Sequence, residues 1–241
     1  MMTNFNSTIA VLIPIYKTEM SDSELLSFNQ GIKVLSKYPI IIVKPESLNI
    51  NDILAQNPGI TTQSFDNKYF ETIAGYNQLL TSLHFYETFF EYEFILIYQL
   101  DALVFGDELE AWCVKGFDYV GAPKVPTSNT VFAFKKPLLN GGLSLRKVKS
   151  CHRLVKFYNK FLGQWPGNED MLFSLHSTRL LPFRVLMRLP HWTQALQFAF
   201  EQNPELCFKL NHDRLPFGSH AWEKYNVDFW KKEIPFLKHL Q

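Results

Sequence analysis

The stretch EFILIYQLD (residues 93–101) decides how this sequence is expected to fold. It is a continuous apolar run with Ile95, Leu96 and Ile97 at its centre, and charged residues bound it. Such a run is typical of a strand that is buried on both faces inside a mostly parallel sheet. The run ends at Asp101, and the ligands of open α/β sheets bind outside the carboxyl ends of the strands. We therefore expect the Asp101 carboxylate to hold a cation or a polar substrate.

The segments before this stretch predict the rest of the parallel sheet. Residues 8–15 (TIAVLIPI) and 39–43 (PIIIV) are apolar runs that read as strands. The residues between them have a helical pattern as far as Lys37, which Ser21 or Ser23 can cap. A strand, a helix and a strand with short connections are typical of a βαβ unit, whose strands are parallel.

The remaining chain is expected to form further strands and helices. Residues 60–65 predict a weaker third strand, and residues 69–92 predict one long helical stretch rich in aromatic side chains. After the central strand we expect helices over 107–113, 147–161, 169–177 (capped by Asn168) and 191–201. Strands are expected over 118–122, 143–145 and 206–210, with a loop over 124–137 and a turn at 216–218. Without repeats or linkers, residues 1–241 are expected to form a single α/β domain.

Composition and charge exclude some functions. The chain has 24 Lys and Arg against 23 Asp and Glu, so nothing indicates a nucleic-acid partner. Cys113, Cys151 and Cys207 are far apart without zinc spacing, so we expect buried free thiols in a reducing compartment. The apolar run at residues 9–15 is short and contains Pro14, which does not fit a signal peptide or a membrane span. We expect a soluble, cytoplasmic protein.

Several motifs follow one another in a fixed order. They are IPIYK (13–17), YQLDALVF (98–105), WC (112–113), DYVGAP (118–123), NGGLSLR (140–146), NEDMLFS (168–174) and PFGSHAW (216–222). The series resembles a bacterial family first catalogued as a domain of unknown function and grouped with GT-A-type glycosyltransferases. The resemblance covers nearly the whole chain. It implies a single GT-A-like (Rossmann-like) domain with a central, mostly parallel sheet flanked by helices.

The same resemblance implies an enzymatic activity. It implies transfer of a sugar from a nucleoside-diphosphate sugar, with a UDP-sugar favoured, to a hydroxyl group of a glycan or lipid-linked acceptor, as in polysaccharide biosynthesis. It also implies a divalent metal, Mn²⁺ or Mg²⁺, that neutralises the leaving diphosphate. An inverting reaction is expected, and a retaining one stays open because the sequence does not fix the face of attack.

The resemblance implies two metal ligands. GT-A enzymes usually supply an Asp-x-Asp motif, and here Gln99 replaces its first carboxylate, which leaves Asp101 as the expected direct ligand beside the donor. His220 matches the C-terminal histidine that folds back onto the metal in many GT-A enzymes, and imidazole suits Mn²⁺. The alternatives are a strand-end Asp that caps a turn and a packed or surface His. His212 and His191 are the competing ligands.

The resemblance also implies a catalytic base. NEDMLFS is similar to the Glu-Asp pair that opens a helix in inverting GT-A enzymes, so Asp170 is expected to take the proton of the acceptor hydroxyl. The helix N-terminus should keep this carboxylate ionised. Glu169 would contact the acceptor or face solvent. The alternative for both is ordinary acid placement in a first helical turn.

Further residues are expected around the donor. Asn140, Gly141 and Gly142 would form the floor beside the donor sugar with backbone groups pointing into the cleft, and a β-bulge or tight turn is the alternative. Arg146 pairs either with a diphosphate oxygen or with a buried carboxylate, and the sequence leaves this choice open.

The nucleotide is expected after the first strand. Tyr16 can stack on uracil, Lys17 follows it, and Asn77 can reach the same base from the long helix; a core Tyr and an exposed Lys are the alternatives. Residues 183–188 contain two arginines and are a candidate for peripheral contact with the inner face of the membrane, or else the basic edge of a helix.

Two rival functions remain. A sugar-phosphate nucleotidyltransferase uses a related sheet, but the loop after the first strand lacks the Gly-rich, Arg-containing phosphate cradle of such enzymes. A non-catalytic nucleotide- or sugar-binding protein of the same fold is supported by Gln99 in place of a carboxylate. Binding of a nucleotide without turnover would distinguish it from an enzyme.

Overall fold

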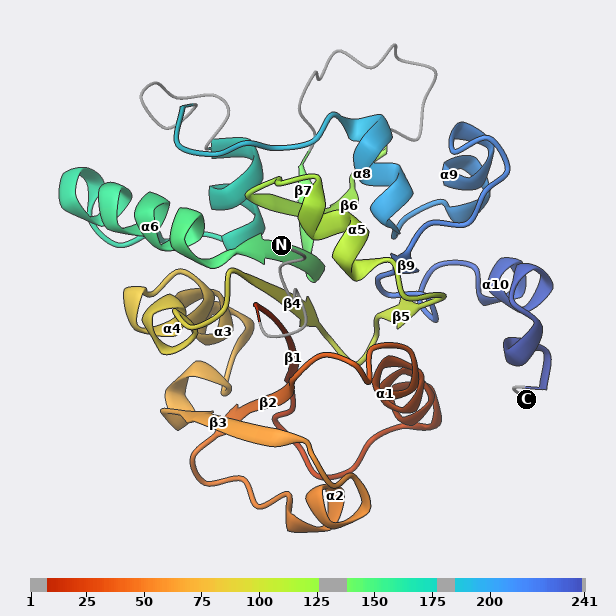
Figure 1. The fold of residues 1–241 in the computed structure, drawn as a ribbon, viewed down its shortest axis with the longest axis horizontal. Coiled ribbons are helices and arrows are strands. Elements are labelled where there is room, and N and C mark those ends of the chain that lie inside the picture. The colour runs from red at the N-terminus through yellow and green to blue at the C-terminus, as the bar shows by residue number, and fades with distance from the viewer. Residues whose placement is uncertain (1–7, 126–137, 177–184, 240–241) are drawn as a thin grey trace, which may run out of the picture.

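The computed structural model describes residues 8–125, 138–176 and 185–239 (Figure 1). Its centre is a six-stranded sheet in the order β3-β2-β1-β4-β7-β6. The strands are β1 (Ile9–Pro14), β2 (Ile40–Pro45), β3 (Thr61–Phe65), β4 (Phe94–Tyr98), β6 (Tyr119–Pro123) and β7 (Leu139–Lys147). The first four are parallel, whereas β7 is antiparallel to both of its neighbours. The predicted mostly parallel α/β sheet is therefore confirmed.

β1 and β4 form the buried middle of the sheet. Every residue of both strands is buried, and they pair in parallel from Ile9↔Phe94 to Leu12↔Ile97. Their β-branched and aromatic side chains pack well on a pleated surface that is covered on both faces. The strands expected at residues 8–15, 39–43, 60–65 and 93–100 are all present.

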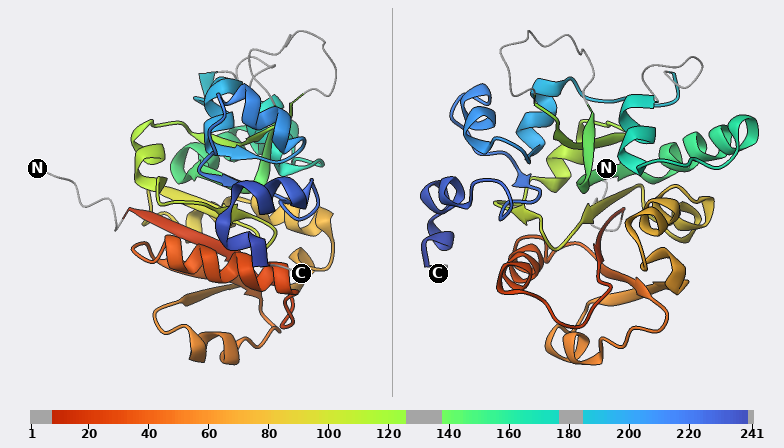
Figure 2. Two further views of the ribbon diagram at one scale, coloured as in Figure 1. Left: turned by 90° about the vertical axis from the view of Figure 1, so that its right-hand side faces the viewer. Right: turned by 180° about the vertical axis from the view of Figure 1, so that it is seen from behind.

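Helices cover both faces of this sheet. The helices of the described residues are α1 (Asp22–Val34), α2 (Asn51–Gln56), η2 (Asn67–Tyr69), α3 (Ile73–Leu80), α4 (Leu83–Thr88), α5 (Leu109–Val114), α6 (Val148–Leu162), the π-helix η3 (Met171–His176), α8 (Trp192–Phe198), α9 (Pro204–Leu210), α10 (Val227–Glu233) and η5 (Pro235–His239). In Figure 1, α3, α4 and α6 lie on one side of the sheet and α1, α5 and α8 on the other, as the reverse view in Figure 2 confirms. Ser21 caps α1 with a capping box, as expected.

A second, three-stranded sheet was not expected from the sequence. It has the order β5-β9-β8, from β5 (Leu103–Val104), β9 (Gly218–Ser219) and β8 (Ala199–Phe200). Each strand has two residues, which is too short for a periodic sequence pattern. The small sheet joins the segment after β4 to two segments near the C-terminus, and this joining builds the candidate site.

Two predicted helices are interrupted. The stretch 69–92 begins at the last residue of η2 and contains the separate helices α3 and α4, because Thr72 and Ser82 each accept a backbone N–H at the start of a new helix. The helix predicted at 191–201 ends at Phe198, where the chain enters β8.

Two predictions near the C-terminus are wrong. Residues 206–210 belong to helix α9 rather than to a strand, and Pro204 stands in the first helical turn, where its fixed φ and missing N–H favour a helix start. The turn predicted at 216–218 is wrong at Gly218, which belongs to strand β9 and pairs with both β5 and β8. The loop expected at 124–137 lies outside the described residues from 126 onward.

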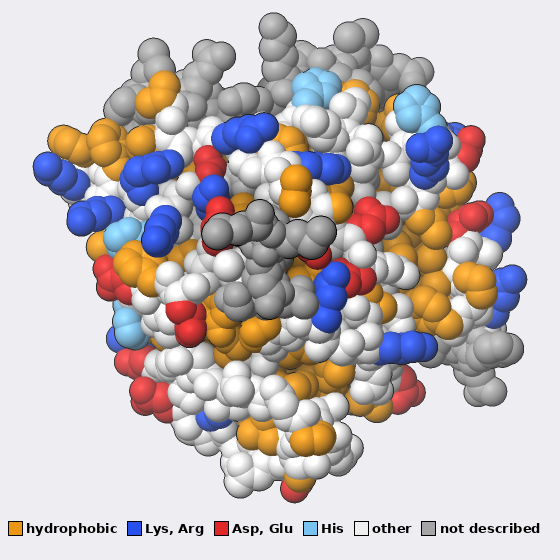
Figure 3. Space-filling view, in the orientation of Figure 1, with side chains coloured by type: hydrophobic (Ala, Val, Ile, Leu, Met, Phe, Trp, Pro, Cys, Tyr) orange, Lys and Arg blue, Asp and Glu red, His pale blue; other side chains and the backbone are white. Residues whose placement is uncertain are grey.

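Cys113, Cys151 and Cys207 are buried free thiols, as expected. Among the helices of the described ranges, none combines the length and the apolar composition that crossing a membrane requires. Figure 3 shows charged side chains of both signs on the surface, with Lys and Arg gathered at its left, where α6 lies in Figure 1.

Candidate functional site

The candidate site begins where β4 ends. The backbone N–H of Ala102 donates to the carbonyl of Gln99 (2.9 Å), which closes a turn directly after the strand. This turn exposes half of the Asp101 side chain (50%), while the neighbouring Leu100 stays buried. Asp101 therefore stands at the carboxyl edge of the parallel strands, where ligands of such sheets bind.

The small sheet brings His220 to this edge. The backbone N–H of His220 donates to the carbonyl of Phe200 (2.9 Å), and Nε2 of its ring lies 3.3 Å from Oδ1 of Asp101. The ring is buried, and within the described residues Nε2 has no aligned hydrogen-bond partner. Because a buried polar atom is normally satisfied, this nitrogen is available to a ligand.

Glu201 belongs to the same site, although the sequence did not indicate it. Its Oε1 lies 3.4 Å from Nδ1 of His220 and accepts a hydrogen bond from Nδ2 of Asn140 (3.2 Å). Glu201 directly follows the apolar strand β8, just as Asp101 follows the apolar run of β4. A carboxylate immediately after a buried apolar run is the signal that could have found it.

The carboxylates set the protonation of His220. Burial alone would lower the pKa of His220, but Asp101 and Glu201 outweigh this effect and raise the pKa to about 9. Burial would raise the pKa of Asp101, but the nearby imidazole outweighs it and lowers that pKa. Asp101 is therefore ionised at neutral pH, and the imidazole is cationic when nothing else binds Nε2.

These groups fit a divalent cation of the kind that the resemblance implies. A carboxylate oxygen and an imidazole nitrogen suit Mn²⁺, and adjacent ligands of an octahedral ion with bonds of about 2.1 Å lie about 3.0 Å apart. In the part of the chain that the structure describes, no group of three or more acidic, His or Cys side chains surrounds a cation site. A bound substrate and water would supply the other ligands.

The competing histidines do not join this pair. The ring of His191 accepts from the backbone of Thr193 at the start of α8 and also contacts the Thr193 hydroxyl. His212 is exposed in the turn after α9, with a φ of 57°. His220 is thus the histidine that the fold brings to Asp101.

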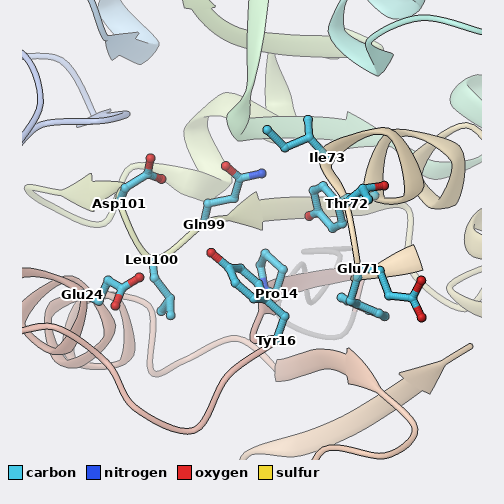
Figure 4. A pocket seen from close by; sticks show the side chains of 11 residues that line it. Pro14, Tyr16, Glu24, Glu71, Thr72, Ile73, Gln99, Leu100 and Asp101 are labelled. Atoms are coloured by element: carbon cyan, nitrogen blue, oxygen red, sulfur yellow. The ribbon is translucent and has the colours of Figure 1, made fainter. Parts of the chain in front are cut away.

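A pocket of about 510 Å³ opens beside Asp101 (Figure 4). Its walls come from the end of β1, from α1, from the start of α3 and from the end of β4. The lining residues are Pro14, Tyr16, Glu24, Phe70, Glu71, Thr72, Ile73, Tyr76, Gln99, Leu100 and Asp101. Three of these described residues are acidic and none is Lys or Arg, so the pocket itself has no cation to offer an anionic ligand.

Tyr16 and Gln99, both predicted to contact the donor, line this pocket, and Tyr16 is 59% exposed. The ring of Tyr16 is therefore accessible to a flat ligand. Lys17 follows Tyr16, and its Nζ forms an ion pair with Glu24 (2.7 Å) at the pocket wall. This pairing neutralises one of the three acidic side chains.

Asn77 does not line the pocket. Its Nδ2 donates to the carbonyl of Ile73, and its Oδ1 accepts the backbone N–H of Glu169 (both 2.8 Å). Both ends of the amide are engaged within the protein. The arrangement gives no support to the expected contact with a nucleotide base, and Asn77 instead ties α3 to the segment that carries Glu169.

Arg146 and Glu169 form a buried ion pair. Nη2 of Arg146 lies 3.0 Å from Oε1 of Glu169, and the Arg146 side chain has no exposed surface. The guanidinium also donates to Ser144 and Tyr86. The sequence left two possible partners for Arg146, a diphosphate oxygen or a buried carboxylate. In the structure its partner is the buried carboxylate of Glu169, which gives no support to contact with a diphosphate. The expectation that Glu169 faces solvent is wrong, because only 6% of it is exposed.

Asn140, Gly141 and Gly142 lie in β7 where its register with β6 shifts between Gly121 and Pro123, which agrees with a bulge or a similar irregularity. Both backbone groups of Gly142 are occupied within the protein: its N–H donates to Oδ1 of Asn140, and its carbonyl accepts from the backbone N–H of Gln99. These two groups of Gly142 are not free for a ligand, and the floor expected beside the donor sugar stays a prediction.

The two glycines make room for site side chains. A methyl group on Gly141 would overlap the Glu169 carboxylate, and one on Gly142 would overlap the ring of His220 and the amide of Gln99. Neither glycine has a positive φ, so the close approach of side chains, and not an unusual backbone conformation, requires glycine here.

Asp170 lies just before η3. Its Oδ1 is buried and has no hydrogen-bond partner among the described residues. Burial raises the pKa of Asp170 and outweighs the backbone N–H of Met171 and the charges of Arg146 and His220. This direction is opposite to the one expected from a helix N-terminus, and a raised pKa makes the carboxylate a better proton acceptor.

Comparisons with known proteins agree with this fold. The sequence profile of the family described as "Protein of unknown function (DUF5672)" matches residues 59–220. No curated protein matches the chain. Among solved structures, it is similar to the galactosyltransferase LgtC in complex with donor and acceptor sugar analogs (TM-score 0.54, 9% identity, 95% of this chain and 94% of LgtC covered). It is also similar to mouse xyloside xylosyltransferase 1 (TM-score 0.51, 11% identity, 87% and 96% covered). Identities this low describe a shared GT-A-type fold.

Proposed function

Since the chain belongs to the DUF5672 family, for which no activity is described, and has a glycosyltransferase-like fold, we propose that it is a nucleotide-sugar-dependent glycosyltransferase. The donor would be a nucleoside-diphosphate sugar and the acceptor a hydroxyl group of a glycan. The observation that carries the proposal is the pair of Asp101 and His220, whose facing atoms lie 3.3 Å apart and of which Asp101 lines the pocket.

Asp101 and His220 would hold a divalent cation, Mn²⁺ or Mg²⁺. When bound, this cation would neutralise the charge that develops on the departing diphosphate. The pocket favours such a requirement, because none of its described lining residues is Lys or Arg, and the adjacent Lys17 is already paired with Glu24, so no side chain of the lining neutralises a diphosphate. Glu201 would hold the ring of His220 through Nδ1, as carboxylates commonly do for metal-binding histidines.

The other residues would divide between donor and acceptor. Tyr16 would stack on the base, for which uracil is the favoured candidate, and Gln99 would hydrogen-bond the donor. Asp170 would accept the proton of the attacking hydroxyl, which corresponds to an inverting reaction. Glu169 and Arg146 would position the segment that carries Asp170 and would not touch the substrate.

Calorimetric titration with a panel of nucleoside diphosphates, in Mn²⁺ and in chelator, tests the donor site. We expect one diphosphate to bind in Mn²⁺ only, and Asp101→Asn to weaken that binding at least about tenfold, because it removes an anionic metal ligand. Asp52→Asn, an exposed Asp in the first turn of α2, is the matched control and should bind as the wild type does. A folded protein that binds none of the diphosphates would contradict the proposal.

A non-catalytic binding protein is the second candidate, because Gln99 occupies the position of a carboxylate. The two functions differ in turnover of the bound donor. The substrate is the sugar nucleotide that carries the base found by titration. The wild-type enzyme should convert it and release nucleoside diphosphate. Asp170→Asn should bind this donor equally but release nucleoside diphosphate far more slowly. Binding without any release by the wild type, with or without glycan acceptors, would favour the non-catalytic protein.

A further inference from the structure

The solvent face of α6 is uniformly cationic. Lys149, Arg153, Lys156 and Lys160 are all exposed, and their spacing of three and four residues places them on one face of the helix. The helix contains no Asp or Glu along its 15 residues. Because the whole chain has nearly equal numbers of basic and acidic residues, this face is a local concentration of charge.

The opposite face of α6 fixes the helix in the fold. Val148, Cys151, Leu154, Val155 and Tyr158 are buried against the core. In the second turn of α6, His152 contacts Glu87 of α4 and packs edge-on against Phe90. The cationic side chains are therefore presented on a rigid helix, which keeps their spacing constant.

The cationic face ends at an exposed apolar tip. Phe161 is 60% exposed and Leu162 is 55% exposed, directly after Lys160. Figure 3 shows hydrophobic side chains beside the Lys and Arg side chains at the left of the view, where α6 lies in Figure 1. Large apolar side chains adjoining a cationic face are typical of a surface that lies on anionic lipid.

We propose that the face formed by Lys149, Arg153, Lys156 and Lys160, together with Phe161 and Leu162, binds the surface of an anionic lipid bilayer. Charge complementarity selects lipid headgroups of negative charge. The apolar tip selects a bilayer over a nucleic acid, because Phe161 and Leu162 can enter the region between headgroups and acyl chains. Binding would be peripheral and independent of the activity of the pocket.

Lys149, Lys156 and Lys160 can be substituted without loss of an ion pair within the described part of the protein. Arg153 donates to the carbonyl of Leu186 (3.0 Å), so its substitution would also disturb the neighbouring segment. No ion pair with Lys149, Lys156 or Lys160 occurs in the described structure. The sequence offered residues 183–188 as a candidate for membrane contact or else as the basic edge of a helix, and 183 and 184 lie outside the described residues. The exposed cationic and apolar side chains of α6 carry the present proposal.

Co-sedimentation of the full chain with vesicles tests the proposal. We expect binding to vesicles that contain phosphatidylglycerol, no binding to vesicles of phosphatidylcholine alone, and weaker binding as salt increases. The triple variant Lys149→Gln, Lys156→Gln, Lys160→Gln should bind about 100-fold more weakly, at about fivefold for each lysine near an anionic surface. Phe161→Ser with Leu162→Ser should weaken binding even where salt is high, because it removes the apolar contact.

The matched control removes the same charge elsewhere. Lys33→Gln, Lys209→Gln and Lys231→Gln change three lysines on α1, α9 and α10 and should leave vesicle binding within about twofold of the wild type. Equal loss in the control and in the α6 variant, both with native circular dichroism, would overturn the assignment to α6. Absence of binding to anionic vesicles, or binding to double-stranded RNA in its place, would overturn the proposal itself.

Discussion

Nη2 of Arg146 lies 3.0 Å from Oε1 of Glu169, and both side chains are buried between β7 and the segment before η3. Removing one partner of such a pair leaves an uncompensated charge in the interior. Arg146→Met should therefore lower the free energy of unfolding by about 3–5 kcal/mol, measured by urea denaturation. The double variant Arg146→Met, Glu169→Leu should be more stable than Arg146→Met, because neither charge is then left unpaired.

The control for this comparison is Arg214→Met at an exposed position, which should change the free energy of unfolding by no more than about 0.5 kcal/mol. If the double variant were destabilised by the sum of its two single substitutions, the side chains would not act as a pair.

Gly142 and His220 are a second close pair. A methyl group on Gly142 would overlap Nε2 of His220, so Gly142→Ala should displace the ring from Asp101. We expect the affinity for Mn²⁺, measured by paramagnetic resonance of the free ion, to fall more than about tenfold, as loss of one ligand implies. Gly106→Ala is the control, because a methyl group there meets nothing within 4 Å. Unchanged Mn²⁺ affinity in Gly142→Ala would mean that His220 is not a ligand.

Glu201 should matter for the cation without touching it. Its Oε1 lies 3.4 Å from Nδ1 of His220, and loss of such an outer carboxylate typically costs about 10–100-fold in metal affinity. We expect Glu201→Gln to weaken Mn²⁺ binding in that range, measured with the protein alone. Glu223→Gln, an exposed acidic residue near His220 in sequence, should bind Mn²⁺ as the wild type does. Equal Mn²⁺ affinities in Glu201→Gln and Glu223→Gln would mean that Glu201 does not contribute to the metal site.

The sequence predicted the large sheet because its strands are long, buried apolar runs. The run at 93–101 predicted both β4 and the exposed carboxylate at its end. The resemblance of the ordered motifs predicted a family of unknown function with a GT-A-type fold, and the profile match and the similar structures agree at that level. Features that depend on local sequence pattern were therefore predictable.

The contacts between distant segments were not predictable in this way. β5, β8 and β9 have two residues each, and their pairing depends on how residues near 103, 199 and 218 meet in space. Glu201 reaches His220 only through this small sheet. The choice of Glu169 as the partner of Arg146 likewise depends on the path of the chain between α6 and η3, which no periodicity encodes.

The pKa of His220 makes stability depend on pH in the metal-free protein. Its pKa is about 9 in the fold, against about 6.5 for a free imidazole, so the folded state binds the proton more tightly than the unfolded state. This contribution is fully present below about pH 6.5 and is lost as the pH rises through about 9, with a limit of about 3 kcal/mol. Urea denaturation in chelator should show the free energy of unfolding falling between about pH 6 and pH 9.5. His220→Gln should remove most of this fall, and an equal fall in the variant would assign it to other groups.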